Sequence, residues 1–239
     1  NTNSTLGSSN FDGAIQSTVK VNASAGFSIV KYTGTGSTTN IGHGLGVTPE
    51  VLIVKNRDDS NGWNVYHIGL GGNTPAQNFV ISLNSNAART DQTSNWNDTA
   101  PTSNVFTVGT SNGSNGSNDD MIAYCFSEVS SYSKFGSYIG NGSSDGTFVF
   151  TGFRPAFLIV KATGLTESWY LYDNKRNTFN AVDKYLRADN NYAEGTFILG
   201  DLLSNGFKIR QTDSALNTNG QTYIYLAFAE SPFKNARAR

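Results

Sequence analysis

Cysteine is almost missing from the chain, and this scarcity excludes two common ways of stabilising a fold. Cys125 is the single cysteine among 239 residues. A disulfide within the chain needs two cysteines, and so does a zinc site built on cysteine. Cys125 lies in the apolar run MIAYCFSEV, which predicts a buried structural thiol. The fold is therefore expected to stand without disulfides.

Charge and long apolar runs are also scarce. Charged residues make up 15% of the chain and the net charge is −1, whereas a nucleic-acid binder usually carries a clustered basic excess. No apolar run reaches the roughly 18 residues of a transmembrane helix, so no membrane insertion is expected. The first ten residues, NTNSTLGSSN, lack a positive region, an apolar core and an initiating Met. This argues against a signal peptide and suggests a processed product or a segment of a longer chain.

Asn, Ser, Thr and Gly fill the space that charged residues leave. Gly permits positive φ angles, and the three polar side chains bond to their own backbone, so all four favour turns. Aromatic residues make up 12% of the chain, and many stand beside β-branched residues, as in strands and unlike disordered segments. The composition therefore predicts an all-β fold with long polar turns.

The chain repeats itself at an offset of 106 residues. The stretch GVTPEVLIVK begins at Gly46, and GFRPAFLIVK begins at Gly152. Further matches at the same offset are Tyr32 with Tyr138, Gly34 with Gly140, Gly36 with Gly142, Lys55 with Lys161, Trp63 with Trp169, Tyr66 with Tyr172 and Asn84 with Asn190. After a short deletion, MIAYCFSE, ending at Glu128, matches YIYLAFAE, ending at Glu230. Coincidence does not preserve spacing over so many positions, so the sequence predicts a tandem duplication of a whole domain.

Short apolar runs bounded by turn residues predict the fold of each repeat. The second repeat shows them in AFLIVKA, SWYLYD and QTYIYLAFAES, and such spacing is typical of an antiparallel sandwich. We predict an all-β chain of two tandem, repeated antiparallel β-sandwich domains that are jelly-roll-like. The predicted boundaries are an N-terminal extension or linker over 1–26, the first sandwich over 27–131, the second over 132–233 and a basic C-terminal tail over 234–239. The low-complexity loop from Gly109 to Asp120 is expected to be a mobile hairpin tip.

Residues that carry catalytic or metal chemistry form no recognisable set. His43 and His67 correspond to Val149 and Asp173 in the second repeat, so the fold does not require them. No Gly-x-Ser-x-Gly elbow occurs. Asp119 and Asp120 lack the spacing of a calcium-binding EF-hand loop. The sequence predicts no enzyme activity, no cofactor and no metal.

Repeated aromatic residues offer the better candidates for binding. Trp63, Tyr66, Trp169 and Tyr172 are explained by core packing or, alternatively, by a platform on which a sugar ring stacks. The turn after Tyr172 adds Asp173, Lys175 and Arg176, which are either a solvated turn or partners for sugar hydroxyls. The candidate binding residues are therefore Trp63, Tyr66, Trp169, Tyr172, Asp173, Lys175 and Arg176.

Two further sets of duplicated residues are interpreted as structural. Gly34 and Gly36, with their counterparts, predict a turn that needs positive φ angles. Glu128 and Glu230, the acids that end the last apolar run of each repeat, are expected to cap a turn or, preferably, to pair with Lys55 and Lys161.

Several long stretches resemble a family of virion proteins from tailed phages, especially marine ones, of the tail-fibre or structural type. The stretches are STLGSSNFDGAIQSTVKVNASAGFSIVKYTGTGS, IGHGLGVTPEVLIVKNRD, WNDTAPTSNVFTVGT, IAYCFSEVSSYSKFGSYIGNGSSDGTFVFTGFRPAFLIVK and NGQTYIYLAFAESPF. The resemblance covers nearly the whole chain, from about Ser4 to Phe233. It supplies no catalytic or binding residues.

The resemblance implies a non-enzymatic structural protein on the exterior of a phage particle. Its expected partners are other virion proteins, further copies of itself (a trimer, by analogy with phage fibres) and a glycan on the host surface. Two alternatives stay open. One is a purely architectural protein that decorates a capsid or builds a fibre shaft. The other is a glycan depolymerase, which would need two carboxylates flanking a sugar.

Overall fold

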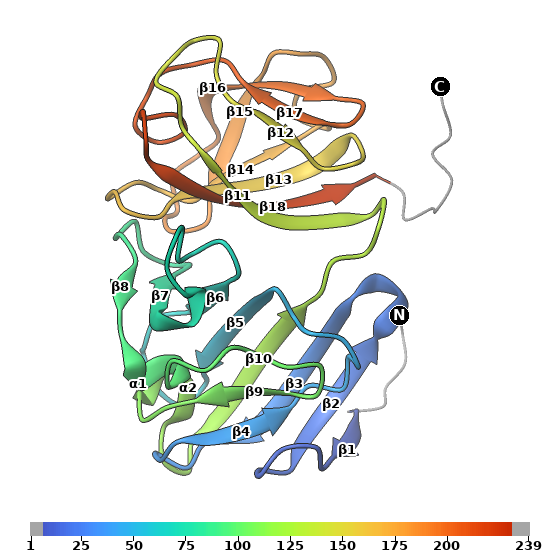
Figure 1. The fold of residues 1–239 in the computed structure, drawn as a ribbon, viewed down its shortest axis with the longest axis vertical. Coiled ribbons are helices and arrows are strands. Elements are labelled where there is room, and N and C mark those ends of the chain that lie inside the picture. Colours follow the sequence, from blue (N-terminus) through green and yellow to red (C-terminus); the bar gives the residue numbers. More distant parts are fainter. Residues whose placement is uncertain (1–6, 231–239) are drawn as a thin grey trace. The chain divides into compact units, whose positions relative to one another are not determined.

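The computed structural model describes residues 7–230 and is an all-β protein (Figure 1). Strands make up 43% of it and helices 6%, which confirms the prediction of an all-β chain. The chain divides into two compact units. Unit 1 contains the described residues up to Val80 together with Thr90–Ser127, and unit 2 contains Ile81–Arg89 together with the described residues from Glu128. The predicted basic tail over 234–239 lies outside the described residues.

Unit 1 is built on an eight-stranded sheet in the order β1-β2-β3-β10-β5-β6-β7-β8. The strands are β1 Ser8–Asn10, β2 Ser17–Asn22, β3 Phe27–Thr33, β10 Asp120–Phe126, β5 Val51–Asn56, β6 Asn64–His67, β7 Phe79–Ser82 and β8 Thr90–Asp91. A second, two-stranded antiparallel sheet pairs β4 (Thr39–Gly42) with β9 (Val105–Val108). The helical turns are η1 Ala23–Ala25, η2 Ala76–Asn78, α1 Thr93–Trp96 and α2 Asn112–Asn115.

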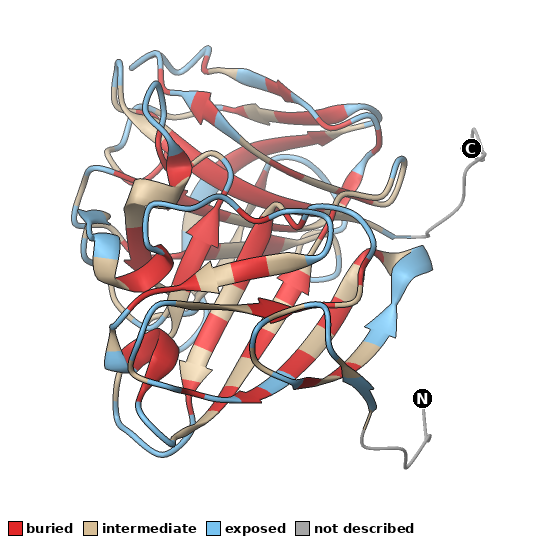
Figure 2. Ribbon diagram, turned by 60° about the horizontal axis from the view of Figure 1, so that its bottom comes forward, coloured by how far each residue is buried: buried red, intermediate tan, exposed pale blue. Residues whose placement is uncertain are grey.

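The core of unit 1 lies between these two sheets. Along β10, Met121, Ala123 and Cys125 are fully buried and the residues between them are half-buried, as the two-residue period of a strand requires. Figure 2 shows this banding of buried and less buried residues along the strands. Ile41 of β4 and Phe106 of β9 belong to the same buried cluster. The less buried face of the large sheet therefore points away from this core.

Unit 2 is built on one eight-stranded sheet in the order β11-β18-β13-β14-β15-β16-β17-β12. The strands are β11 Ser133–Ile139, β18 Thr222–Ala229, β13 Pro155–Ala162, β14 Tyr170–Asp173, β15 Val182–Arg187, β16 Gly195–Leu203, β17 Gly206–Ile209 and β12 Phe148–Phe150. The sheet curls into a nearly closed barrel. Just before β12, the Thr147 hydroxyl donates to the carbonyl of Ile139 at the end of β11, at 2.7 Å.

The two units share the order of their central strands. In unit 1, β10 lies between β3 and β5, and β6 follows β5. In unit 2, β18 lies between β11 and β13, and β14 follows β13. The register agrees as well, because Lys55 faces Ile122 and Lys161 faces Ile224. Elements that match in sequence therefore take equivalent places.

A buried asparagine organises the same loop in each unit. The Asn115 amide donates to the carbonyls of Ser37 and Gly109, both at 2.7 Å, and accepts from Thr35 N at 2.8 Å. Asn217 lies 102 positions later and is equally buried. Its amide donates to the carbonyls of Ser143 (2.8 Å) and Gln211 (2.7 Å). The loop from Gly109 to Asp120 was expected to be a mobile tip, but its Gly113–Gly116 turn is buried. The turn is held in place because the Asn115 side chain bonds to the segment 35–37 and to Gly109.

The duplicated lysines have partners other than the predicted glutamates. Lys55 Nζ donates to the carbonyls of Asn56 and Asp59, the latter at 2.7 Å. Lys161 Nζ donates to the equivalent carbonyls of Ala162 (2.8 Å) and Leu165 (3.3 Å). Each lysine therefore closes the turn that follows its own strand. Burial lowers the pKa of Lys161 to about 8.

The acids that were expected to pair with these lysines lie elsewhere. Glu128 forms an ion pair with Lys134 at 2.7 Å, and Glu230 pairs with Lys175 at 2.5 Å. The carboxylate that ends the last apolar run thus has a different cation in each sequence repeat.

Two segments depart from the predicted domain boundaries. Within the predicted extension over 1–26, residues 8–22 supply β1 and β2, which pair with each other and with β3. The segment Ile81–Arg89, expected inside the first sandwich, belongs to unit 2. Its backbone is held there by a bond from Arg89 N to the Thr163 carbonyl at 2.8 Å. Sequence repeats and compact units therefore do not coincide.

Candidate functional site

Most of the predicted aromatic platform is buried. Trp169 and Tyr172 have exposed fractions of 1% and 0%, and Tyr66 has 5%. The Trp169 indole donates to the Ser82 carbonyl at 2.9 Å, and the Tyr172 hydroxyl donates to the Phe197 carbonyl at 3.2 Å. Rings enclosed in this way offer no face to a sugar, so these three residues are packing residues. Trp63 is half-buried and stacks on Tyr124, with the ring centroids 6.3 Å apart.

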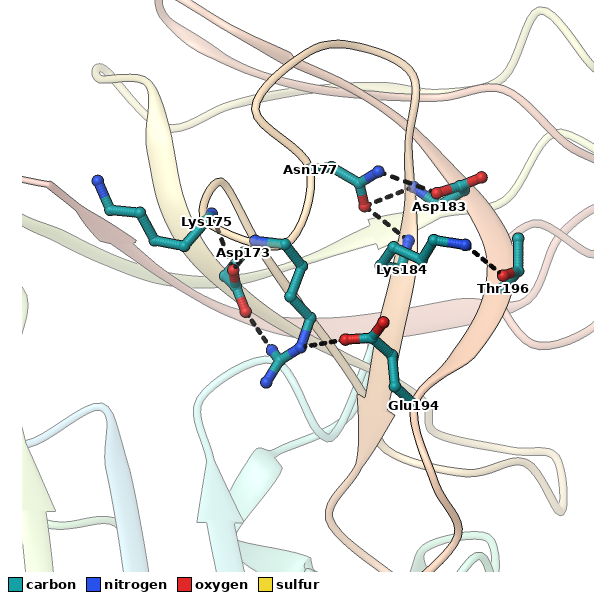
Figure 3. A network of polar contacts seen from close by, with 8 residues as sticks. Asp173, Lys175, Asn177, Asp183, Lys184, Glu194 and Thr196 are labelled. Atoms are coloured by element: carbon teal, nitrogen blue, oxygen red, sulfur yellow. Dashed lines mark hydrogen bonds and ion pairs between the residues drawn. The ribbon is translucent and has the colours of Figure 1, made fainter.

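The polar residues after β14 bind one another (Figure 3). Asp173 accepts from the backbone N–H groups of Lys175 (2.9 Å) and Arg176 (2.7 Å) and forms an ion pair with the Arg176 guanidinium. Arg176 Nε also donates to Glu194 at 2.9 Å. Asp173 and Arg176 thus stabilise this turn, as in the solvated-turn interpretation, and Arg176 ties it to the end of the segment before β16. Lys175 is exposed and bound to Glu230.

His43 and Cys125, whose side chains could act as a base or a nucleophile, are both buried. His43 is fully buried, with Nε2 3.1 Å from the Thr102 carbonyl and Nδ1 accepting from Leu45 N at 3.2 Å. Burial lowers the pKa of His43 below its usual value and raises the pKa of the Cys125 thiol to about 12. Within residues 7–230, no three His, Cys, Asp or Glu side chains are grouped to hold a metal ion. None of the helices in this range has the length and apolar character needed to cross a bilayer.

Unit 2 contains a pocket that the predicted residues do not line. Its volume is about 460 Å³. Its walls come from the segments 84–86 and 187–192, of which 84–86 and 190–192 correspond at the repeat offset, together with Ser168. The lining residues are Asn84, Ser85, Asn86, Ser168, Arg187, Asp189, Asn190 and Tyr192.

The arginine of this pocket is held among aromatic rings. The Arg187 guanidinium carbon lies 5.3 Å from the ring centres of Tyr170 and Tyr185 and 5.8 Å from that of Tyr192. Cation–π attraction fixes its plane, and Nη2 lies 3.4 and 3.3 Å from the hydroxyls of Tyr170 and Tyr185. The buried Nε of Arg187 has no hydrogen-bond partner among the described residues. A buried donor without a partner is uncommon and costs free energy.

The aspartate of the pocket is fixed by its neighbours. Asp189 Oδ1 accepts from Trp169 N at 2.9 Å, and Oδ2 accepts from the Ser168 hydroxyl at 3.1 Å and the Asn190 amide at 3.4 Å. The negative charge of Asp189 offsets the positive charge of Arg187, so these two lining residues add no net charge to the pocket. Such a pocket suits a neutral polar molecule.

Tyr192 adds an exposed aromatic face to the pocket. Its exposed fraction is 70%, and its backbone N–H donates to the Asn190 side chain at 3.2 Å. An exposed ring beside fixed amide, carboxylate and guanidinium groups is the combination that sugars need, with an apolar face and a polar edge.

Sequence reasoning did not identify Arg187, Asp189 or Tyr192 as site residues. One signal for the site was present, because Asn84 and Asn190 match in the repeat and both line the pocket. The signal was weak because a pocket built from two loops leaves no fixed spacing in the sequence. Of the predicted residues, Trp169 bonds to a pocket residue through its backbone N–H and Asp189, whereas Arg176 bonds to Glu194, which does not line the pocket.

Comparison with known proteins identifies a family. A family model described as "Domain of unknown function (DUF7483)" matches residues 2–232. The chain therefore belongs to this family. No curated protein and no solved structure matches it.

Proposed function

We propose that this DUF7483 chain is a non-enzymatic structural protein on the exterior of a tailed-phage particle, where it binds a glycan of the host surface. The virion assignment is supported by the sequence resemblance described above, which extends over nearly the whole chain. Its other partners are then virion proteins and further copies of the chain, in a trimer by analogy with phage fibres.

The two units are, in this proposal, tandem copies of one jelly-roll-like β-sandwich domain. Support comes from the shared order of their central strands. It also comes from the matched bonds of Asn115 and Asn217, and from the paired turns closed by Lys55 and Lys161. Bonds this similar at equivalent positions are hard to explain without a common ancestor domain.

The observation that carries glycan binding is the pocket of unit 2. Tyr192 can stack on the apolar face of a pyranose ring. Arg187 and the Asn84 and Asn190 side chains line the pocket, where guanidinium and amide groups can meet hydroxyl groups. Because Arg187 and Asp189 balance in charge, the geometry favours a neutral sugar over an acidic one.

The same pocket gives less support to the two alternatives, a glycan depolymerase and a purely architectural protein. A glycan depolymerase would need two carboxylates on either side of the bond that breaks, and the only carboxylate among the pocket's lining residues is Asp189. A purely architectural protein would have no reason to keep a fixed arginine and aspartate beside an exposed tyrosine.

A glycan-array screen of the whole chain tests the binding proposal. Tyr192→Ala and Arg187→Gln are expected to lose at least tenfold in affinity, since each removes a principal contact. Phe179→Ala is the matched control, because Phe179 is 83% exposed and does not line the pocket. Equal binding by all variants, or no binding across neutral glycans, would overturn the site.

The proposed position on the exterior of the phage particle is tested by a separate experiment. Antibodies against the chain should label intact phage particles in immuno-electron microscopy, without detergent or disruption. Label that appears only after particles are broken would contradict exterior display.

A further inference from the structure

The wall segment 84–86 of the pocket lies outside the sheet of unit 2. It is part of Ile81–Arg89, which belongs to unit 2 although the described residues up to Val80 and those from Thr90 to Ser127 belong to unit 1. None of the strands in the sheet of unit 2 lies in Ile81–Arg89, so no ladder of backbone bonds fixes the segment there. Individual bonds from residues of unit 2 therefore hold this wall in place.

Lys161 of β13 makes one of these bonds. Its Nζ donates to the Asn86 carbonyl at 3.4 Å, and also to the carbonyls of Ala162 (2.8 Å) and Leu165 (3.3 Å). An ammonium group has three N–H donors, so the three carbonyls match it in number. Ala162 and Leu165 belong to the turn that Lys161 closes after β13, and the third donor is left for the wall.

Lys55, the counterpart of Lys161 in the first repeat, closes the same turn in unit 1. Its Nζ donates to the carbonyls of Asn56 and Asp59, the latter at 2.7 Å. At the repeat offset these two carbonyls correspond to those of the turn after β13. Closing the turn therefore takes two bonds from the lysine, and the bond from Lys161 to Asn86 is additional to that shared structural role.

Trp169 holds the same segment at a second point and also bonds to the other wall. Its indole N–H donates to the Ser82 carbonyl at 2.9 Å, two residues before the wall segment 84–86. Its backbone N–H donates to Oδ1 of Asp189 at 2.9 Å, in the wall segment 187–192. One residue that does not itself line the pocket therefore connects its two walls.

We propose that Lys161 and Trp169 are positioning residues of the pocket, which hold the wall segment 84–86 at the spacing from 187–192 that a bound sugar requires. Neither residue lines the pocket, so both act through the residues they bond to. A sugar that contacts both walls binds well only when supporting bonds fix the side chains that it meets. The inference rests on the proposed function for the nature of the ligand, whereas the bonds that hold the wall are independent of it.

Lys161→Met and Lys55→Met form a matched pair, because each removes two turn bonds and only the first removes the bond to Asn86. Both variants of the whole chain are titrated on an array of neutral glycans. Lys161→Met should lose about tenfold in affinity, as expected for one hydrogen bond from a charged donor. Lys161→Arg keeps the donors and should recover most of the loss, and Lys55→Met should bind like the original chain. Equal affinity in Lys161→Met and the original chain, or an equal loss in Lys55→Met, would overturn the inference.

Hydrogen exchange of residues 81–89, followed by mass spectrometry without any glycan, tests the positioning by itself. Lys161→Met and Trp169→Phe should each speed this exchange about tenfold, and Lys55→Met should leave it unchanged. Lys161→Gln replaces Lys161→Met if circular dichroism shows that the latter does not fold. Faster exchange in a chain that binds no glycan would support the positioning role and contradict the proposed ligand. Unchanged exchange in both variants would overturn the inference, whatever the array shows.

Discussion

At the scale of single residues, the most informative side chains are polar and buried. Asn115 and Asn217 each satisfy backbone groups from separate parts of the chain. A buried carbonyl without a partner costs free energy, so an amide that serves several of them holds the loop more firmly than an apolar side chain of equal size. These asparagines lie in polar, low-complexity stretches where sequence patterns indicate only a loop.

Replacing Asn217 by alanine should therefore destabilise the protein strongly. The Ser143 and Gln211 carbonyls would lose their donor and Asn141 N its acceptor, so we expect a loss of about 3 kcal/mol in the free energy of unfolding. Urea unfolding followed by circular dichroism measures it. Asn219→Ala is the control, because Asn219 is an exposed residue of the same loop. Similar losses in the two variants would show that Asn217 does not organise the loop.

At the scale of elements, the sequence predicted strands well and their connections poorly. The alternation in MIAYCFSE and the run VLIVK correspond to β10 and β5. Gly36 has the expected positive φ of 69°, but the same prediction for Gly34 is wrong. The strand β2 was missed because STVKVN lies outside the repeat, and repetition was the main guide to the domain boundaries. The pocket was missed because loops far apart in sequence form it.

Gly34, in the turn after β3, and Gly46, between β4 and β5, need glycine for two different reasons. A Cβ on Gly34 would lie 2.1 Å from the Gly116 carbonyl oxygen, whereas Gly46 has a φ of 73° and nothing within 4 Å of an added Cβ. Gly46→Ala should cost about 1 kcal/mol of backbone strain. Gly34→Ala should cost about 3 kcal/mol, because the α2 turn must move. Thermal unfolding of both variants checks the order, and an equal or reversed order would refute the close-approach explanation.

At the scale of the whole molecule, duplicated residues have different surroundings. Trp63 and Trp169 occupy equivalent places at the start of β6 and β14, but Trp63 is half-buried and Trp169 is enclosed. Sequence comparison of the repeats predicts the same environment for both. The difference arises because Ile81–Arg89 folds with unit 2, which no local pattern indicates.

Acrylamide quenching of tryptophan fluorescence should reveal this asymmetry at low protein concentration. The chain has three tryptophans, and Trp96 and Trp169 are each 1% exposed. Trp63→Phe should remove most of the emission that acrylamide can reach, and Trp169→Phe should leave it nearly intact. Comparable losses in the two variants would contradict the different burial of the two sites.

The enclosed thiol has a practical consequence for labelling. Cys125 is fully buried with its pKa raised to about 12. Maleimide reagents are attacked by thiolates, so they should not label Cys125 in the folded protein. A cysteine introduced on the surface would then be the one site that takes a dye or a spin label. Cys125 does not have to be removed first, so distances between introduced labels can be measured on a chain that is otherwise unaltered.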